Sequence, residues 1–150
     1  MYWQQVGSAR ETLENLPTSA KLVLMSADSK ALIMRKTSGV FDLPGGKVET
    51  GEDLFDALKR EVKEEVGLKA KKFEFVSSWV KHNPEIGDRL VIVFSCQLKK
   101  LAKDIKITLS EEHTWAEFKG PRKTFLNDDI PPGYANALSI CFARHPKLKD

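Results

Sequence analysis

Three glutamates, Glu61, Glu64 and Glu65, stand at positions i, i+3 and i+4 of the chain. On a helix this spacing places three carboxylates on one face within a single turn. Like charges so close together repel one another and destabilise the helix unless a positive charge lies among them. Carboxylate oxygen is the ligand that hard divalent cations such as Mg²⁺ prefer in proteins. The spacing therefore indicates a divalent-cation site.

An ordinary exposed helix face is the alternative interpretation, because Lys59, Arg60 and Lys63 alternate with the glutamates and could simply form a solvated surface. The turn at residues 43–46, Leu-Pro-Gly-Gly, favours the cation site. Proline presets its own φ angle, and glycine adopts backbone conformations closed to other residues. A tight turn that leads into an acidic helix is more specific than the acidic helix alone.

A helix that begins near residues 50–53 and ends at Gly67 must position these carboxylates. Acidic residues lie in its first turn, as the helix dipole favours, and Gly67 suits a left-handed C-cap. Its apolar residues recur every four positions and form one buried stripe. They are Leu54, Leu58, Val62 and Val66, with Phe55 and Ala57 alongside.

Residues 46–68 resemble the Nudix box, which is written G-x5-E-x7-R-E-U-x-E-E-x-G-U with U an aliphatic residue. Every fixed position is met, by Gly46, Glu52, Arg60, Glu61, Val62, Glu64, Glu65, Gly67 and Leu68. With each residue type at a frequency of about 5–7%, a chance match is on the order of 10⁻⁸. The resemblance implies an α/β fold, the Nudix-type α/β/α sandwich with a mixed β-sheet.

The same resemblance implies that a phosphoanhydride bond is hydrolysed in a nucleoside diphosphate linked to a group X. The implied ligands of Mg²⁺ or Mn²⁺ are the Gly46 carbonyl and the carboxylates of Glu61, Glu64 and Glu65. The cations would neutralise phosphate charge while water attacks phosphorus. Glu64 or Glu112 would take the proton from that water, and Glu52 and Arg60 would orient the metal ligands.

Glu112 is a candidate base because members of the family often place an acid after the box in the pattern E-H-x4-W. Glu112, His113 and Phe118 match this pattern, with Phe in place of Trp. Glu111 is the alternative acid, and a polar turn before a strand is an equally good interpretation of the segment. His113 itself is expected to be structural rather than catalytic.

Substrate contacts are predicted from Arg35, which lies before the glycine turn, where family members commonly keep a basic residue facing the phosphates. Phe41, His82 and Trp79 could stack on a base, or could equally belong to the core. Pro84, sixteen residues past the box, resembles a proline of members that cleave ADP-ribose. The S-Q-P-W-P-x-P-x-S motif of NADH-cleaving members is absent from the sequence.

The expected substrate is thus a small nucleotide, either a nucleoside triphosphate or a nucleotide sugar such as ADP-ribose. An RNA 5′-end pyrophosphohydrolase would use the same site, but it needs a basic path for RNA that the sequence does not localise. A non-catalytic nucleotide-binding sensor is a third class, and such proteins usually show decay in the box. No decay is present here.

The net charge of +3 is too small to predict that the protein binds nucleic acid. The box holds seven acidic and four basic residues, a balance of −3, so the remainder of the chain carries +6. An acidic centre in a mildly basic chain suits a metal site that faces a polyanionic substrate. The paired lysines outside the box are interpreted as solvated surface.

Length and composition predict one Nudix hydrolase domain over residues 1–150, with 41% hydrophobic and 30% charged residues. No apolar run approaches the ~18 residues of a membrane span, and the N-terminus lacks the layout of a signal peptide. Cys96 and Cys141 lie in apolar segments and are expected to be buried thiols in a reducing compartment. We therefore expect a cytoplasmic protein that contacts no membrane; its oligomeric state is not predicted.

Apolar runs and turn residues predict the other elements. The expected strands are residues 21–26 and 31–36, which form a hairpin, then 40–43, 72–81, 89–98, 105–109 at a sheet edge, and 114–118. The expected helices besides that of the box are residues 9–16 and 133–144. The loop at residues 82–88 carries Asn-Pro and Gly as turn residues. Strands around a central helix, with a closing helix, predict a layered α/β architecture.

Overall fold

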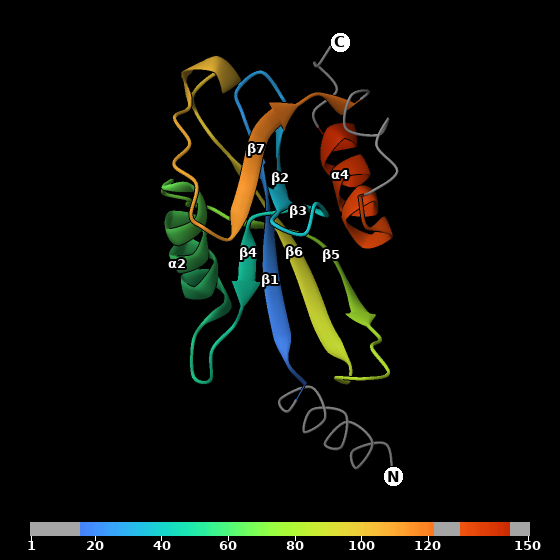
Figure 1. Cartoon of the computed structure of the whole chain (residues 1–150). Coiled ribbons are helices and arrows are strands. Elements are labelled where there is room, and N and C mark those ends of the chain that lie inside the picture. Colours follow the sequence, from blue (N-terminus) through green and yellow to red (C-terminus); the bar gives the residue numbers. More distant parts are fainter. Residues whose placement is uncertain (1–15, 122–129, 145–150) are drawn as a thin grey trace.

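The fold is a mixed β-sheet between two helices, as the computed structural model in Figure 1 shows. The structure describes residues 16–121 and 130–144. The strands are β1 (Thr18–Met25), β2 (Ala31–Lys36), β3 (Phe41–Asp42), β4 (Gly45–Lys47), β5 (Glu74–Lys81), β6 (Arg89–Gln97) and β7 (His113–Lys119). The helices are α2 (Leu54–Val66), α4 (Pro132–Arg144) and the short 3₁₀ helix η1 (Ala102–Asp104). The helix predicted at residues 9–16 lies almost wholly outside the described residues.

The strand order is β3-β2-β1-β6-β5, with β4 paired to β1 and β7 paired to β2. Strands β1 and β6 run parallel over their full length, whereas every other pairing is antiparallel. The predicted hairpin is confirmed, because β1 and β2 pair antiparallel with Met25 opposite Ala31. The predicted mixed sheet is also confirmed. The parallel pairing brings the N-terminal ends of β1 and β6 together at one end of the sheet.

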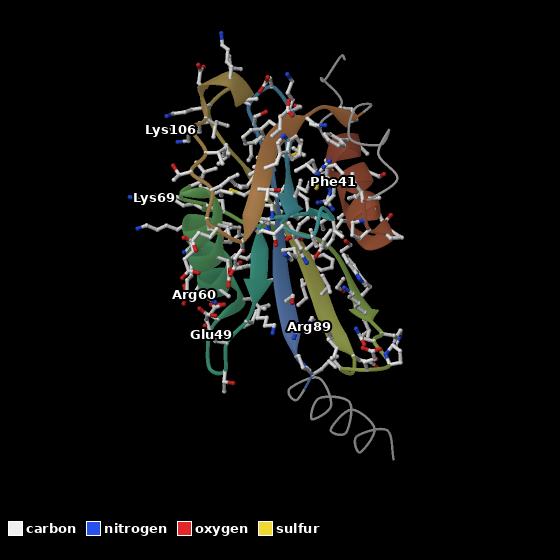
Figure 2. All side chains as sticks on the ribbon, in the orientation of Figure 1. Phe41, Glu49, Arg60, Lys69, Arg89 and Lys106 are labelled. Atoms are coloured by element: carbon white, nitrogen blue, oxygen red, sulfur yellow. The ribbon has the colours of Figure 1, made fainter. Side chains whose placement is uncertain are left out.

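Helix α2 begins and ends where the sequence predicts. The Asp53 side chain accepts a hydrogen bond from the Phe55 amide at 3.1 Å and caps the N-terminus. Gly67 ends the helix in the left-handed conformation, with φ of 74°, and its amide donates to the Lys63 carbonyl. Charged side chains extend from the outer side, among them Arg60, and Lys69 follows just beyond the C-terminus (Figure 2).

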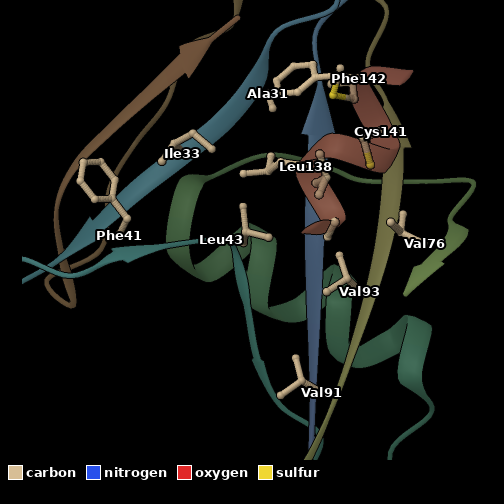
Figure 3. Close-up of a cluster of buried hydrophobic side chains, with 13 residues drawn as sticks. Ala31, Ile33, Phe41, Leu43, Val76, Val91, Val93, Leu138, Cys141 and Phe142 are labelled. Atoms are coloured by element: carbon tan, nitrogen blue, oxygen red, sulfur yellow. The ribbon is translucent and has the colours of Figure 1, made fainter. Parts of the chain in front are cut away.

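Two hydrophobic layers hold the helices against the sheet, because alternate residues of each strand face opposite sides. On one side the buried α2 residues Leu58, Val62 and Val66 pack with Leu22 and Leu24 of β1. The other layer lies under α4, as Figure 3 shows; it includes Val23, Ile33, Val93, Leu138, Cys141 and Phe142. This arrangement is the predicted α/β/α sandwich. The predicted stripe on α2 is buried from Leu58 onwards, whereas Phe55 is 41% exposed.

Both cysteine side chains are buried, as predicted, and they lie in opposite layers. The Cys96 thiol donates to the Lys71 carbonyl at 3.0 Å, and burial raises the pKa of the Cys141 thiol to about 11. Both thiols are therefore protonated at neutral pH. Within residues 16–121 and 130–144, no helix is long and apolar enough to cross a membrane.

The predicted edge strand at residues 105–109 is wrong. Over residues 105–110 the described chain is extended but pairs with no strand. Its amides bond instead to the end of α2, from Thr108 to the Val66 carbonyl and from Ser110 to the Glu65 carbonyl, both at 3.0 Å. Ile107 packs against the α2 layer of the core. The alternation of apolar residues in this segment thus reflects packing beside a helix C-terminus, which also offers unpaired carbonyls.

Candidate active site

A cleft of about 960 Å³ lies beside α2 and contains most of the predicted metal site. Its walls come from β1, β4, α2, the N-terminal end of β6, and the loop before β7. Among the predicted residues, it is lined by Gly46, Glu61, Glu64, Glu65 and Glu112, together with Glu111 and His113. Residues that lie up to about seventy positions apart in sequence thus face a common space.

Arg60 joins the acidic residues of the site to one another. Its Nε donates to Glu52 Oε2 at 2.8 Å and its Nη2 donates to Glu52 Oε1 at 3.0 Å. Nη1 donates to Glu61 Oε1 at 2.9 Å and, more weakly, to Glu64 Oε2 at 3.4 Å. The Arg60 guanidinium and the Glu49 amide lower the pKa of Glu52 to about 2. Glu52 and Arg60, which the family resemblance assigns to orienting the metal ligands, are therefore in direct contact.

The turn before α2 makes this contact possible. The sequence places Glu52 two helical turns before Arg60, too far for a straight helix, so a bent entry is needed. The Glu52 amide donates to the Glu49 carbonyl at 2.9 Å, and the Glu49 amide donates to Glu52 Oε1 at 3.1 Å. This reciprocal pair folds residues 49–52 back toward the helix and fixes the Glu52 carboxylate beside Arg60.

Glu65 is the most unusual carboxylate in the cleft, because it is only 3% exposed and its Oε2 atom has no hydrogen-bond partner. Burial, followed by the hydrogen bond that joins it to Glu61, raises the pKa of Glu65 to about 9. Two carboxylates can lie this close only when a proton or a cation separates their charges. Without a cation, the pair holds a proton at neutral pH.

Gly46 brings the main chain against this pair. A Cβ atom at this position would lie 2.8 Å from the carboxyl carbon of Glu61 and 2.9 Å from both of its oxygens. Only glycine leaves that space open. The main chain at Gly46 therefore lies so close to the Glu61 carboxylate that no side chain fits between them.

These groups fit a divalent cation in their chemistry. Glu61 and Glu65 supply adjacent carboxylate oxygens, one of them buried and unpartnered, and Gly46 supplies main chain beside them. Glu64 lies instead against Arg60, with its side chain 59% exposed. Within the described part of the chain, no three acidic, histidine or cysteine side chains converge on one point. Glu64 can join Glu61 and Glu65 only by leaving Arg60.

A buried polar chain beneath the cleft is absent from our sequence predictions. Lys21, on β1, is 8% exposed, and its Nζ donates to Asp42 Oδ1 at 3.0 Å and to the carbonyls of Leu43 and Gly45 at 3.1 and 3.2 Å. Asp42 Oδ2 lies 3.0 Å from His113 Nε2. Lys21 thus holds the carbonyls of the glycine turn in place. The sequence signal for it is a lysine directly before the apolar run of residues 22–25.

The chain continues from His113 to the carboxylate pair. His113 Nδ1 lies 4.0 Å from Glu65 Oε2, and neither atom has another partner. Although burial opposes its charge, the His113 hydrogen bond and the Lys21 ammonium hold the pKa of Asp42 below its usual range. The structure places His113 in the interior, where it connects β3 and α2. It links buried groups and is only 7% exposed where it lines the cleft.

The four predicted substrate contacts, Arg35, Phe41, His82 and Pro84, do not line the cleft. Phe41 is a core residue, 3% exposed, with its ring 6.0 Å from that of Trp115 in an edge-on contact. The Arg35 guanidinium lies over the Phe41 ring at 4.6 Å. His82 pairs with Asp88 at 3.0 Å across the exposed loop that also carries Pro84. Aromatic packing therefore accounts for the first two residues.

Other basic side chains line the cleft instead. They are Lys36, Lys47, Lys81 and Arg89, with Tyr134 from α4 beside them. Arg89 begins β6 and donates to Ser19 Oγ at 3.1 Å, which orients it across the parallel β1–β6 pairing. Lys36 and Lys81 each end a strand. Only the sheet topology brings these strand ends to one rim, so sequence spacing gave no signal for them.

We predict that Gly46→Ala weakens Mg²⁺ binding by at least about tenfold while the fold persists. The added methyl group pushes the Glu61 carboxylate away, and misplacing a ligand costs roughly 10–100-fold in metal affinity. Titration calorimetry with Mg²⁺ measures the affinity. Gly87→Ala is the control, because Gly87 lies outside the cleft and a Cβ there meets no atom within 4 Å, although its φ is 91°. Equal Mg²⁺ affinity of Gly46→Ala and the parent would contradict the prediction.

Comparison with known proteins is consistent with this geometry. Residues 15–133 match the family model of the NUDIX domain. Nudix hydrolase 6 of Arabidopsis thaliana is 33% identical over 97 residues, which is 65% of this chain and 33% of the relative. The mitochondrial NAD(P)H pyrophosphatase NUDT13 of Homo sapiens is 29% identical over 143 residues, 86% of this chain and 39% of the relative. The chain thus spans less than half the length of either relative.

Among solved structures, the MutT protein from Methanosarcina mazei Go1 superposes with a TM-score of 0.74 at 23% identity. The match covers 88% of this chain and 96% of that one. At this level of identity the comparison establishes the shared fold alone.

Proposed function

This chain belongs to the NUDIX domain family, and we propose that it is a pyrophosphohydrolase that depends on a divalent cation, Mg²⁺ or Mn²⁺. Its proposed reaction is hydrolysis of a phosphoanhydride bond in a nucleoside diphosphate linked to a further group. The observation that carries this proposal is the hydrogen-bonded pair of Glu61 and Glu65 at the Gly46 turn, in which the Glu65 side chain is buried and its Oε2 atom has no hydrogen-bond partner. Such a pair of carboxylates is stable in the folded chain only when a proton or a cation lies between their charges.

The cation would be held by Glu61, Glu65 and the Gly46 carbonyl, with Glu64 as a further ligand. A divalent cation held there would neutralise charge on phosphate oxygens and would make a bound water more acidic. The protein contributes position: Arg60 fixes Glu61 through a 2.9 Å hydrogen bond, and Glu52 fixes Arg60 through two more. These outer contacts limit the rotamers of the ligands before any cation binds.

Proton removal from the attacking water is assigned to Glu112. Glu112 and its neighbour Glu111 are both exposed and both line the cleft, on the loop that enters β7. An exposed carboxylate on a loop can approach a water molecule in the cleft. Glu65 is buried and cannot approach it in this way. Glu64 is the second candidate because it also faces the cleft.

The substrate class follows from size and charge. A cleft of about 960 Å³ accommodates a small nucleotide, since ligand pockets commonly measure about 300–1,000 Å³. Lys36, Lys81 and Arg89, at strand ends of the sheet, also line the cleft and would supply positive charge for phosphates beyond the reacting one. A nucleoside triphosphate and a nucleotide sugar such as ADP-ribose both have this form. The name of the human relative points to dinucleotides as well.

A substrate panel tests the proposal directly. Nucleoside triphosphates, ADP-ribose and NADH are incubated with the protein and Mg²⁺ or Mn²⁺, and products are separated by chromatography. A triphosphate is expected to give a monophosphate and pyrophosphate, whereas ADP-ribose gives two monophosphates. EDTA is expected to abolish release. Nucleotide binding without product release under either cation would overturn the proposal in favour of a nucleotide sensor.

A further inference from the structure

A second cleft, of about 670 Å³, lies beyond the C-terminal end of α2. Six lysines line it, from three separate stretches of the chain: Lys69, Lys71, Lys72, Lys99, Lys100 and Lys106. We call this the lysine cleft. Figure 2 labels Lys69 and Lys106 on the same flank of the molecule as Arg60 and Glu49. None of the six lysines lines the candidate active site.

The charge of the lysine cleft is uncompensated. Glu74 is the single acid among its lining residues, so six lysines against one glutamate give a local net charge of +5. This exceeds the net charge of the whole chain, which is +3. In the described parts of the chain, no carboxylate lies within 4.0 Å of any of the six amino groups. All six side chains are exposed and able to reach a ligand.

The floor of the lysine cleft is apolar, formed in part by Leu68, Leu98 and Ile105. Neither an arginine nor an aromatic residue is among its lining residues. Arginine forks and backbone nests fix a single phosphate in a defined orientation, whereas lysines act as mobile point charges. Several mobile lysine charges above an aliphatic floor therefore suit a flexible ligand that has several phosphates and also apolar groups. They suit a single anion of fixed shape less well.

We propose that the lysine cleft binds a single strand of nucleic acid through its sugar-phosphate backbone. Phosphate contacts from lysines hold a strand without selecting its sequence. Unpaired bases can also remove part of the aliphatic floor from water, although no aromatic side chain is present for them to stack on. A double helix keeps its bases paired and stacked, so their faces are not free to contact the floor of the cleft. The proposal does not depend on hydrolysis at the candidate active site, because none of its residues belongs to that site.

The two clefts are nevertheless close enough to act on one ligand. Lys69 follows Glu65 by four residues, and Lys106 precedes Ser110 by four. Four residues of fully extended chain span at most ~14 Å. That distance equals about four stacked nucleotides at 3.4 Å each. A strand held by the lysines therefore has its end within reach of the carboxylate pair.

Fluorescence anisotropy with a 5′-fluorescein-labelled oligouridylate of twelve nucleotides tests the proposal. The full chain is titrated in EDTA, which prevents cation-dependent cleavage, over a series of salt concentrations. We compare the parent with the triple variant Lys69→Gln, Lys71→Gln, Lys106→Gln. The variant is expected to bind at least tenfold more weakly at low salt. Losing three phosphate contacts should lower the salt slope, log Kd against log salt, by about 2.

The control is Lys30→Gln, Lys59→Gln, Lys63→Gln, which removes the same charge from side chains outside both clefts. It is expected to bind within about twofold of the parent. Equal losses in the two triple variants would mean that only net charge matters, and would overturn the proposal. So would tripolyphosphate or polyglutamate binding as tightly as the oligonucleotide. Because binding is measured without catalysis, an inactive enzyme would leave this result unaffected.

Discussion

Glu65→Gln is expected to lower the rate of phosphoanhydride hydrolysis by at least about 10²-fold at saturating Mg²⁺. The substitution removes the buried carboxylate whose Oε2 atom is free to bind a cation. Loss of even an outer partner of a metal ligand costs roughly 10–100-fold, so loss of a ligand itself costs no less. Initial rates measured over a Mg²⁺ series give the effect. Activity within tenfold of the parent would contradict the proposal that Glu65 is a metal ligand.

The same variant should be more stable than the parent when no cation is present. The pKa of Glu65 is raised in the folded chain to about 9, from an ordinary value of 4.5. Between these pH values the folded state binds more protons than the unfolded state, so stability falls as pH rises. Glutamine has no proton to lose. In EDTA, the variant's Tm should therefore exceed the parent's at pH 9 and approach it at pH 5.

Glu117→Gln is the matched control for both measurements, because Glu117 is exposed on β7 and lines neither cleft. It removes the same charge from the surface. We expect parental activity and a Tm difference that does not grow with pH. If the Tm difference from the parent grew with pH in both variants, the cause would be a general effect of charge and not the loss of the Glu65 carboxylate.

Glu112→Gln is expected to lower kcat by about 10²–10⁴-fold, the usual contribution of a general base. Glu111→Gln, next to it on the same cleft wall, should lower kcat by less than about threefold, since only one of the two acids is expected to reach the water. The pH–rate profile separates a base from a binding residue, because loss of the base removes the acidic limb. Small and equal effects of both variants would assign the base to Glu64.

Local signals in the sequence specify α2 and its caps. The Asp53 and Gly67 ends, the buried stripe and the carboxylate spacing all depend on contacts within a few residues, so periodicity and capping chemistry predict them. The contact between Glu52 and Arg60 is also local, although it needed a bend that only the fold-back of residues 49–52 provides. The hairpin of β1 and β2 follows from its turn in the same way.

Features that depend on strand register and sheet topology cannot be predicted from such local sequence signals. The pairing of Lys21 with Asp42, and of Asp42 with His113, requires β1, β3 and β7 to meet in one sheet. The rim residue Arg89 reaches the cleft only through the parallel pairing of β1 and β6. An aromatic residue in a two-residue strand, such as Phe41, gives no periodicity from which to infer the face it occupies.

The two hydrogen bonds that tie residues 108–110 to the end of α2 have a consequence for sequence divergence. Both donors, the amides of Thr108 and Ser110, and both acceptors, the carbonyls of Val66 and Glu65, belong to the main chain. Any residue except proline preserves such a tether, because proline alone lacks the amide hydrogen. The exposed side chains of this segment can therefore change without loss of the tether, whereas Ile107 and Leu109 are also held by packing against the core. The spacing between α2 and the loop of Glu111 and Glu112 is therefore set by main-chain hydrogen bonds.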